Sequence, residues 1–124
     1  MFGLQRTGKH MAHYIIYFNQ QWVGDHSEEW IQSRGPLARA AVAEMKDAGV
    51  LVFAAGVDED PGKAFSADGT SGELRFGEGR YSSAPEYLGG FTVIDVASRE
   101  AARFWAGKIA LACGWPQEVR PLHV

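Results

Sequence analysis

The sequence predicts a small α+β fold in one domain, and three observations support this prediction. Short runs of β-branched and aromatic residues, typical of strands, alternate with two longer amphipathic segments, typical of helices. Each amphipathic segment ends at a glycine, Gly49 or Gly114, the residue best suited to the left-handed conformation at a helix end. A chain of 124 residues, 46% of them hydrophobic, is long enough for one packed core and short for two.

The first half of the chain predicts a strand, a helix and a second strand. Residues 13–18 ("HYIIYF") are bulky and apolar, which favours a central strand buried on both faces. Ser27, followed by two glutamates, predicts a helix start. Gly35-Pro36 is expected to interrupt or restart that helix, because proline fits only in a first turn. The second strand spans residues 50–56. The apolar stripe of the helix consists of Leu37, Ala38, Ala41, Val42, Met45 and Ala48.

The second half predicts a hairpin, a strand, a helix and a last strand. Residues 64–76 ("AFSADGTSGELRF") indicate an exposed hairpin with a loose tip. A strand follows at 91–96, Ser98 caps the second helix, and residues 118–124 form the last strand. One face of the strand at 91–96 carries Phe91, Val93 and Asp95, and the other carries Thr92, Ile94 and Val96. The buried stripe of the second helix consists of Ala102, Trp105, Ile109 and Ala112.

The order of these elements also predicts the architecture and the assembly. Strand, helix, strand, strand, helix, strand, with a hairpin inserted before the third strand, is the β-α-β-β-α-β pattern of ferredoxin-like domains. Both helices then cover one face of the sheet, although the strands carry apolar residues on both faces. The second face needs a cover, and a second copy of the chain is the simplest one. We therefore expect a homodimer.

Composition and charge argue against several classes of protein. Twelve basic and fifteen acidic residues give a net charge of -3 without a basic block, which argues against nucleic-acid binding. No apolar run approaches the roughly 20 residues of a membrane span. A single cysteine, Cys113, excludes an internal disulfide and a zinc site built from cysteines. The start lacks the apolar core of a signal peptide, so we expect a cytoplasmic protein, with residues 1–10 as a disordered tail and Met11 as the natural start.

Four segments carry a family resemblance: "MAHYIIYF", "AGVLVFAAG", "PEYLGGFTVIDVASREAARFWAGKIA" and "EVRPL". In this order they resemble the YCII-related family, specifically its DGPF-domain branch, over most of residues 11–122. The most specific parts are Glu-x-Leu-Gly-Gly from Glu86 and Glu-Val-Arg-Pro from Glu118. The resemblance implies a ferredoxin-like domain at residues 11–124, assembled as a dimeric α/β barrel, with a cavity between the sheet and the helices near the barrel mouth.

Two departures from the family pattern affect the functional expectation. Glu78-Gly79-Arg80-Tyr81 stands where the branch usually has Asp-Gly-Pro-Phe, which keeps an acid, a glycine and an aromatic ring. Some YCII-like proteins are thought to work through a His-Asp pair whose histidine lies on the first helix. The matching helix at residues 37–48 contains no histidine, so that mechanism does not carry over.

Two histidines and two glutamates are the candidate catalytic residues. His13 opens the first strand and either presents its imidazole to the cavity or is a surface residue. His26 either pairs with Asp25, which would raise the basicity of the imidazole, or belongs to the helix entry. Glu78 and Glu86 flank the altered family signature, where they either move a proton or are solvated loop charges.

Arg80, Tyr81, Glu118 and Arg120 are the candidate substrate-binding residues. Arg80 and Tyr81 either hold a carboxylate or belong to a solvated loop. Glu118 and Arg120, two apart on a strand, share a face and either pair with each other or project together toward the cavity or the partner subunit. No metal or other cofactor is expected, because residues 58–60 ("DED") lack calcium-loop spacing and no phosphate-binding glycine motif occurs.

Three functions remain open at this level. The first is a cofactor-free enzyme that performs proton-transfer chemistry on a small aromatic or carboxylate-bearing metabolite, with Arg80 or Arg120 holding the anion. The second is a non-catalytic ligand-binding or regulatory accessory protein. The third is a dimer with a purely structural role. The absence of a helix histidine shifts the balance toward binding.

Overall fold

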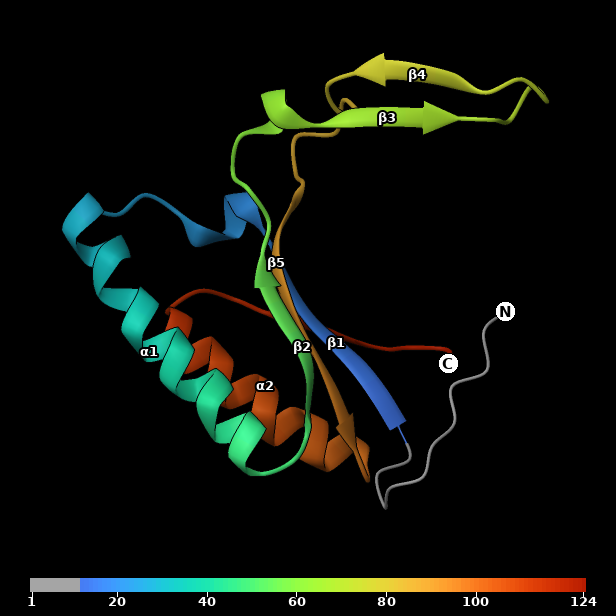
Figure 1. The fold of residues 1–124 in the computed structure, drawn as a ribbon. Coiled ribbons are helices and arrows are strands. Elements are labelled where there is room, and N and C mark those ends of the chain that lie inside the picture. Colours follow the sequence, from blue (N-terminus) through green and yellow to red (C-terminus); the bar gives the residue numbers. More distant parts are fainter. Residues whose placement is uncertain (1–11) are drawn as a thin grey trace.

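The computed structural model describes residues 12–124, in which two helices pack on one face of an antiparallel sheet and a hairpin projects from one end (Figure 1). The predicted α+β class is therefore confirmed. The expected tail at residues 1–10, with His10, and the expected start at Met11 lie outside the described residues. None of the helices formed by residues 12–124 has both the length and the apolar character needed to cross a bilayer.

The main sheet has four antiparallel strands in the order β2-β5-β1-β6. These strands are β1 (Ala12–Asn19), β2 (Leu51–Gly56), β5 (Leu88–Val96) and β6 (Glu118–Pro121). Strand β1 pairs with β5 on one side and with β6 on the other, so the predicted central position of the first strand is confirmed. Its predicted burial on both faces is not, because only Ile16 of β1 is buried in the described chain. This order, with a helix after β1 and another after β5, is compatible with a ferredoxin-like fold.

Helix α1 (Glu28–Asp47) runs through Gly35 and Pro36 without a break, so the predicted interruption is wrong. Proline costs the helix one backbone hydrogen bond, because its ring nitrogen carries no hydrogen. Residues on both sides of Pro36 contact helix α2 (Arg99–Cys113) or the core beside it. Tertiary packing of the helix therefore outweighs the local cost of the proline.

Local signals determine the ends of both helices as predicted. The Oγ atoms of Ser27 and Ser98 each accept the backbone N–H three residues further on, at 3.1 Å, and so cap α1 and α2. Gly49 and Gly114 follow the helix ends with φ of 75° and 90°. Glycine reaches these positive φ values without steric cost, which explains why both helices stop there.

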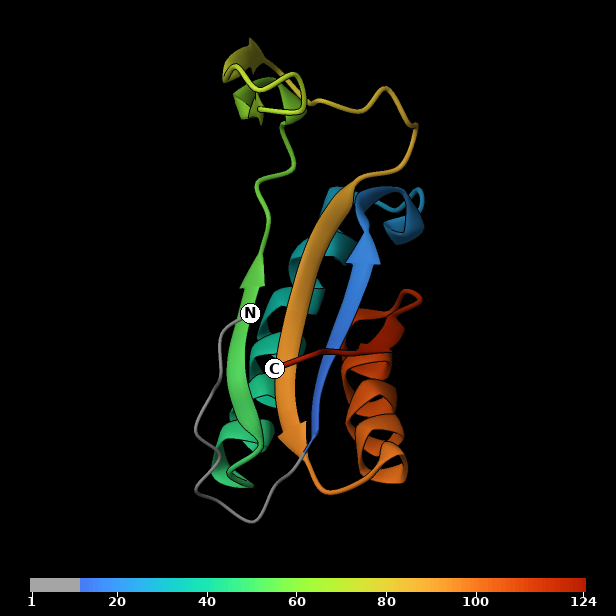
Figure 2. The ribbon, with the colours of Figure 1, turned by 90° about the vertical axis from the view of Figure 1, so that its right-hand side faces the viewer.

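The core lies between the two helices and the sheet (Figure 2). The largest fully buried side chains are Ile16, Met45, Ile94 and Val96, contributed by β1, α1 and β5. The predicted helix stripes contribute Ala41, Met45, Ala102 and Ile109 to this core. Two predicted members of the α1 stripe are exposed instead: Leu37 lies at the edge of the stripe, and Ala48 lies at the helix end.

Strands β3 (Phe65–Asp68) and β4 (Arg75–Glu78) form the predicted hairpin as a separate two-stranded sheet. It projects from the end of the main sheet on the side opposite the helices (Figures 1 and 2). Phe65 and Phe76 of the hairpin are largely exposed, as expected for edge strands. The short 3-10 helices η1 (Gln20–Val23) and η2 (Pro61–Lys63) follow β1 and precede β3.

The face of the main sheet turned away from the helices is covered by no other helix or strand of the described chain (Figure 2). The strand register places Ile15, Tyr17, Phe91 and Val93 on this face. Phe53 of β2 lies beside them, with its ring centroid 6.0 Å from that of Phe91. We call this surface, which is apolar around Phe53 and Phe91, the open face.

Candidate functional site

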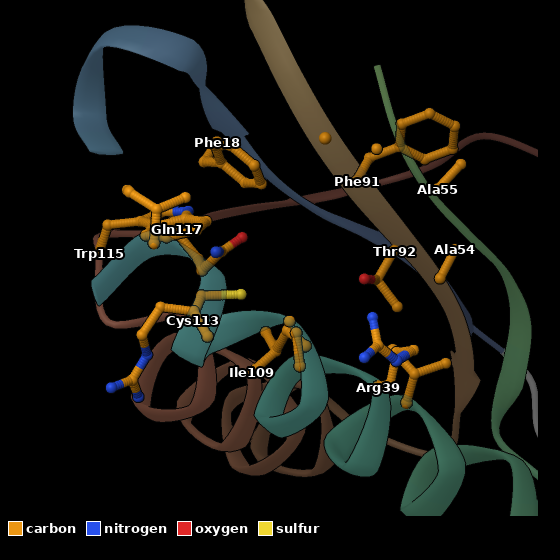
Figure 3. A pocket seen from close by; sticks show the side chains of 17 residues that line it. Phe18, Arg39, Ala54, Ala55, Phe91, Thr92, Ile109, Cys113, Trp115 and Gln117 are labelled. Carbon is orange, nitrogen blue, oxygen red and sulfur yellow. The ribbon is translucent and has the colours of Figure 1, made fainter. Parts of the chain in front are cut away.

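A cavity of about 450 Å³ lies between α1 and the part of the sheet formed by β2 and β5 (Figure 3). Its walls are mainly apolar and include Phe18, Ile31, Val42 and Ile109. The position, between sheet and helices, is the one that the family resemblance implies. We call it the α1 cavity.

Small residues create the space of the α1 cavity. Gly56 of β2 and Gly90 of β5 are register partners, and both line it. A Cβ added at Gly90 would lie 2.8 Å from the ring of Phe18, so this position has to stay small. A Cβ added at Gly56 would meet no atom within 4 Å. Gly56 therefore borders open space at the wall of the cavity.

Two arginines of α1 line the cavity, and they differ in their partners. The Nε and Nη2 atoms of Arg34 donate to the carbonyl of Ala112 at 3.1 and 2.9 Å, and the guanidinium lies over the ring of Trp30. Arg34 thus satisfies a carbonyl at the end of α2. Arg39 has no hydrogen bond or ion pair with any residue between 12 and 124. Its guanidinium is free to meet a ligand.

Two buried donors of the cavity lining have no partner within the described chain. They are Nε1 of Trp115 and Nε2 of Gln117, both in the connection from α2 to β6. The ring of Phe18 packs edge-on against Trp115, with centroids 5.2 Å apart, and fixes its position. A buried donor without an acceptor loses its bond to water and gains none in return. These two atoms therefore indicate where a ligand acceptor fits.

The third titratable residue of the lining is Cys113. Burial raises the pKa of its thiol, and the charge of Arg34 offsets this only in part. The thiol is therefore protonated at neutral pH, which makes it a poor nucleophile. Among residues 12–124, Arg34, Arg39 and Cys113 are the only titratable residues that line the α1 cavity, so this part of the chain supplies it with no general base.

A second cavity, of about 550 Å³, adjoins the first near the start of α1. The two cavities share Phe18, Ile31 and Trp115. The second is lined in addition by polar groups, among them Asp25, His26 and Glu59. We call it the mouth cavity. Its two acids contrast with the α1 cavity, which is lined by no carboxylate of the described residues.

His26 meets an aromatic ring rather than the acid beside it in sequence. Its imidazole stacks on Trp30 with ring centroids 3.7 Å apart and an interplanar angle of 22°. No hydrogen bond or ion pair joins His26 to Asp25 within residues 12–124. Both side chains still line the mouth cavity, so the histidine stands next to an acid without being bonded to it.

His13 lies on the open face, far along the sheet from the mouth cavity. It is the register partner of Asp95, with 3.6 Å between His13 Nδ1 and Asp95 Oδ1. The two side chains are 10% and 25% exposed, and neither of these atoms has a hydrogen-bond partner in the described chain. His13 lines neither cavity, so the structure does not bring it to the pocket.

The connection between β4 and β5 uses its polar groups locally. Arg80 donates to the carbonyl of Ala84 at 2.9 Å and lies over the ring of Tyr87, 4.8 Å from its centroid. Glu86 accepts the indole N–H of Trp22 at 2.8 Å, which ties this connection to η1. Tyr81 is exposed, and neither Arg80 nor Glu86 lines a cavity.

The remaining candidates lie on the hairpin and on the last strand. Glu78 is exposed at the end of β4. Glu118 and Arg120 share the open face, as their spacing predicts, and no ion pair joins them in the described chain. Tyr17 donates its hydroxyl to Glu118, and this hydrogen bond is the main cause of the raised pKa of Tyr17. The candidates chosen from the sequence therefore do not converge on one site.

Sequence reasoning overlooked the cavity residues Arg39, Trp115 and Gln117. One signal could have pointed to Arg39: it stands four residues after Gly35, so its side chain lies over a position without one. Trp115 and Gln117 carry no such signal, because only the packing of α2 against the sheet decides what surrounds them.

Metal binding and family membership have no further support. Residues 12–124 contain no group of three or more side chains of the metal-ligating types arranged to hold an ion. In the acidic run, Asp58 accepts a hydrogen bond from Lys63 Nζ at 2.9 Å, and the N–H of Asp60 together with this lysine lowers the pKa of Asp58.

A scan against models of known families and a search of curated proteins both found no match.

Proposed function

We propose that this chain is a small-molecule-pocket protein of the YCII-related type, and that its function is to bind a small, mostly apolar ligand in the α1 cavity. The observation that carries the proposal is the cavity itself. Its volume of about 450 Å³ lies within the range of roughly 300–1,000 Å³ typical of small-molecule sites. Mainly apolar walls with a few polar groups are also typical of such sites.

Binding is favoured over catalysis by the chemistry of the lining. Two arginines and a protonated thiol offer no group that accepts a proton at neutral pH. A ligand in the α1 cavity would be held without being attacked. A ligand-binding or regulatory accessory role fits this better than a reaction confined to the α1 cavity.

The test uses the neutral dye N-phenylnaphthylamine, whose fluorescence rises in apolar surroundings. We expect the wild-type protein to bind it and the Gly56→Leu variant to lose binding, because the new side chain enters the empty space over Gly56. Gly107→Leu is the matched control: its Cβ also meets no atom within 4 Å, and Gly107 does not line either cavity. Equal binding by wild type and Gly56→Leu, with unchanged melting temperatures, would contradict the proposal.

A second candidate is a cofactor-free enzyme that transfers protons, and the mouth cavity favours it. Asp25, His26 and Glu59 line a space that shares walls with the α1 cavity. A ligand spanning both would place a carbon next to a base that removes a proton and receives one back from solvent. Deuterium incorporation into phenylpyruvate in D2O, followed by NMR, tests this. Wild type should accelerate exchange, His26→Gln should not, and His123→Gln should match wild type.

We also propose that the chain forms a homodimer through the open face, as the two halves of a dimeric α/β barrel. Phe53 is 56% exposed on this face, and Ile15, Phe91 and Val93 extend the apolar surface around it. A surface of this kind on one side of a thin domain needs a cover. Face-to-face packing of two identical sheets is self-complementary and therefore closes as a dimer.

The β3–β4 hairpin supports the same assembly. Its register places Phe65, Ala67 and Phe76 on one face, with Glu78 at the end of that face, and the register partners Asp68 and Arg75 on the other. A two-stranded hairpin is marginally stable alone in water, so its apolar face calls for a partner surface. Because the hairpin projects on the side of the open face, a copy docked there would lie within its reach (Figure 1).

Sedimentation velocity tests the dimer with two matched variants. Phe53 and Phe104 are both 56% exposed, but Phe104 lies on α2, on the opposite side of the sheet. Phe53→Arg should give monomers at micromolar concentration, because it places a charge in the proposed interface. Phe104→Arg should remain dimeric. A wild-type protein that sediments as a monomer would overturn the proposed assembly.

A further inference from the structure

We infer that the ligand of the α1 cavity is a carboxylate with an apolar body and a second hydrogen-bond acceptor at its far end. Arg39 receives the carboxylate, and Trp115 and Gln117 receive the second acceptor. This inference rests on the proposed binding function and specifies its ligand class.

The charge of the cavity favours an anion. Among residues 12–124, Arg34 and Arg39 are the only charged residues of its lining, and no carboxylate of these residues lines it. Arg34 is already bonded to the end of α2, which leaves Arg39 as the free cation. A free guanidinium beside an apolar space presents two parallel N–H donors, which match the two oxygens of a carboxylate.

A hydroxyl stands with Arg39 at this side of the cavity. Thr92 of β5 is itself 6% exposed, and its side chain lines the cavity (Figure 3). A threonine hydroxyl donates one hydrogen bond and accepts others, so it can add to the guanidinium in holding an oxygen. One arginine and one hydroxyl suit a single carboxylate, whereas a phosphate needs more donors than this side of the cavity offers.

The opposite side of the cavity calls for a second acceptor. Figure 3 shows Trp115 and Gln117 across the cavity from Arg39 and Thr92. The unpartnered Nε1 of Trp115 is a donor only, so nothing but an acceptor satisfies it. The unpartnered amide nitrogen of Gln117 has the same need. A carbonyl or hydroxyl oxygen at the far end of the ligand can accept these hydrogen bonds.

The space between the two polar sides sets the body of the ligand. Phe18, Val42, Ala54 and Ile109 contribute walls without hydrogen-bonding side chains. A ring or short chain fits there, because polar atoms in this position would be buried without partners. Para-hydroxyphenylacetate has all three parts and is the probe of choice.

Displacement of N-phenylnaphthylamine measures the preference. We expect phenylacetate to displace the dye at concentrations about tenfold lower than the neutral phenylacetamide, because the charged hydrogen bond to Arg39 is lost in the amide. Arg39→Gln should remove this difference. Arg103→Gln, on α2 and outside both cavities, should keep it.

The second acceptor is tested with the same displacement assay. Para-hydroxyphenylacetate should bind several-fold tighter than phenylacetate, and Gln117→Met together with Trp115→Phe should abolish that gain. Equal displacement by acid and amide, displacement by neither, or a preference that survives Arg39→Gln would overturn the inference while dye binding upholds the proposed function. Failure of the dye itself to bind would overturn both.

Discussion

The α1 cavity and the connection between β4 and β5 both contain charged and aromatic residues, but they differ in how these residues are bonded. In the connection, Arg80 donates to Ala84 and lies over Tyr87, and Glu86 accepts from Trp22. In the cavity, the exposed Arg39 has no protein partner among residues 12–124, and two buried donors have none there either. Residue type alone favoured the connection as the ligand site. Unsatisfied hydrogen bonding favours the cavity as the ligand site.

The physical reason is that a satisfied group has little left to offer a ligand. Replacing an existing hydrogen bond by one to a ligand is nearly neutral, whereas giving a partner to a buried unpaired donor recovers about 1–3 kcal/mol. The connection therefore has a structural role in joining the hairpin to the sheet. The cavity retains the free energy that binding can use.

The largest expected difference between the two regions is in stability. Met45 of α1 is fully buried in the core between the helices and the sheet, and Met45→Ala should lower the free energy of unfolding by about 2–5 kcal/mol because it removes packed atoms and leaves a void. Urea denaturation measures this. A loss below about 1 kcal/mol would mean that the helix layer is loosely packed throughout. The cavity would then not differ from the rest of that layer in its packing.

Removing one of the unpaired donors should change the free energy of unfolding in the opposite direction. Gln117→Met keeps the length of the side chain and removes the buried amide nitrogen, so the unfolding free energy should rise by about 1 kcal/mol while ligand affinity falls. The midpoint of urea unfolding, at an unchanged slope, reports the change. A destabilised variant would show that the amide already has a partner and would remove this difference between cavity and connection.

The bonded groups of the connection predict a smaller loss. Glu86→Gln keeps the shape but removes the charge that accepts the N–H of Trp22, and it should cost about 0.5–1 kcal/mol without changing dye binding. Glu78→Gln is the matched control, because Glu78 is exposed on β4. A large loss of dye binding in Glu86→Gln would place this residue in the ligand site after all.

The smallest effect is expected at Tyr81, which replaces the phenylalanine of the family signature that this chain resembles. Its side chain is exposed, and it forms no hydrogen bond within the described chain. Tyr81→Ala should change the unfolding free energy by less than about 0.5 kcal/mol and leave dye binding unaltered. A clear loss of dimer in sedimentation would instead assign Tyr81 to the proposed interface.

Features that depend on neighbouring residues could be predicted from the sequence. The caps at Ser27 and Ser98 and the helix ends at Gly49 and Gly114 involve contacts within a few residues, so their spacing is visible in the chain. The interruption predicted at Pro36 is wrong because long-range contacts decide the outcome there. The local cost of the proline is real, but the contacts of α1 with α2 and the core, distant in sequence, outweigh it.

The sequence by itself determined the α+β class, the order of strands and helices, the helix caps and the exposed hairpin, because periodicity and short-range hydrogen bonding specify them. Only the tertiary structure decided which polar groups are left without partners. Arg39 and Gln117 are separated by most of the chain, and packing brings them to one cavity. Whether a side chain is satisfied depends on residues far away in sequence, so no local pattern could distinguish them from Arg80.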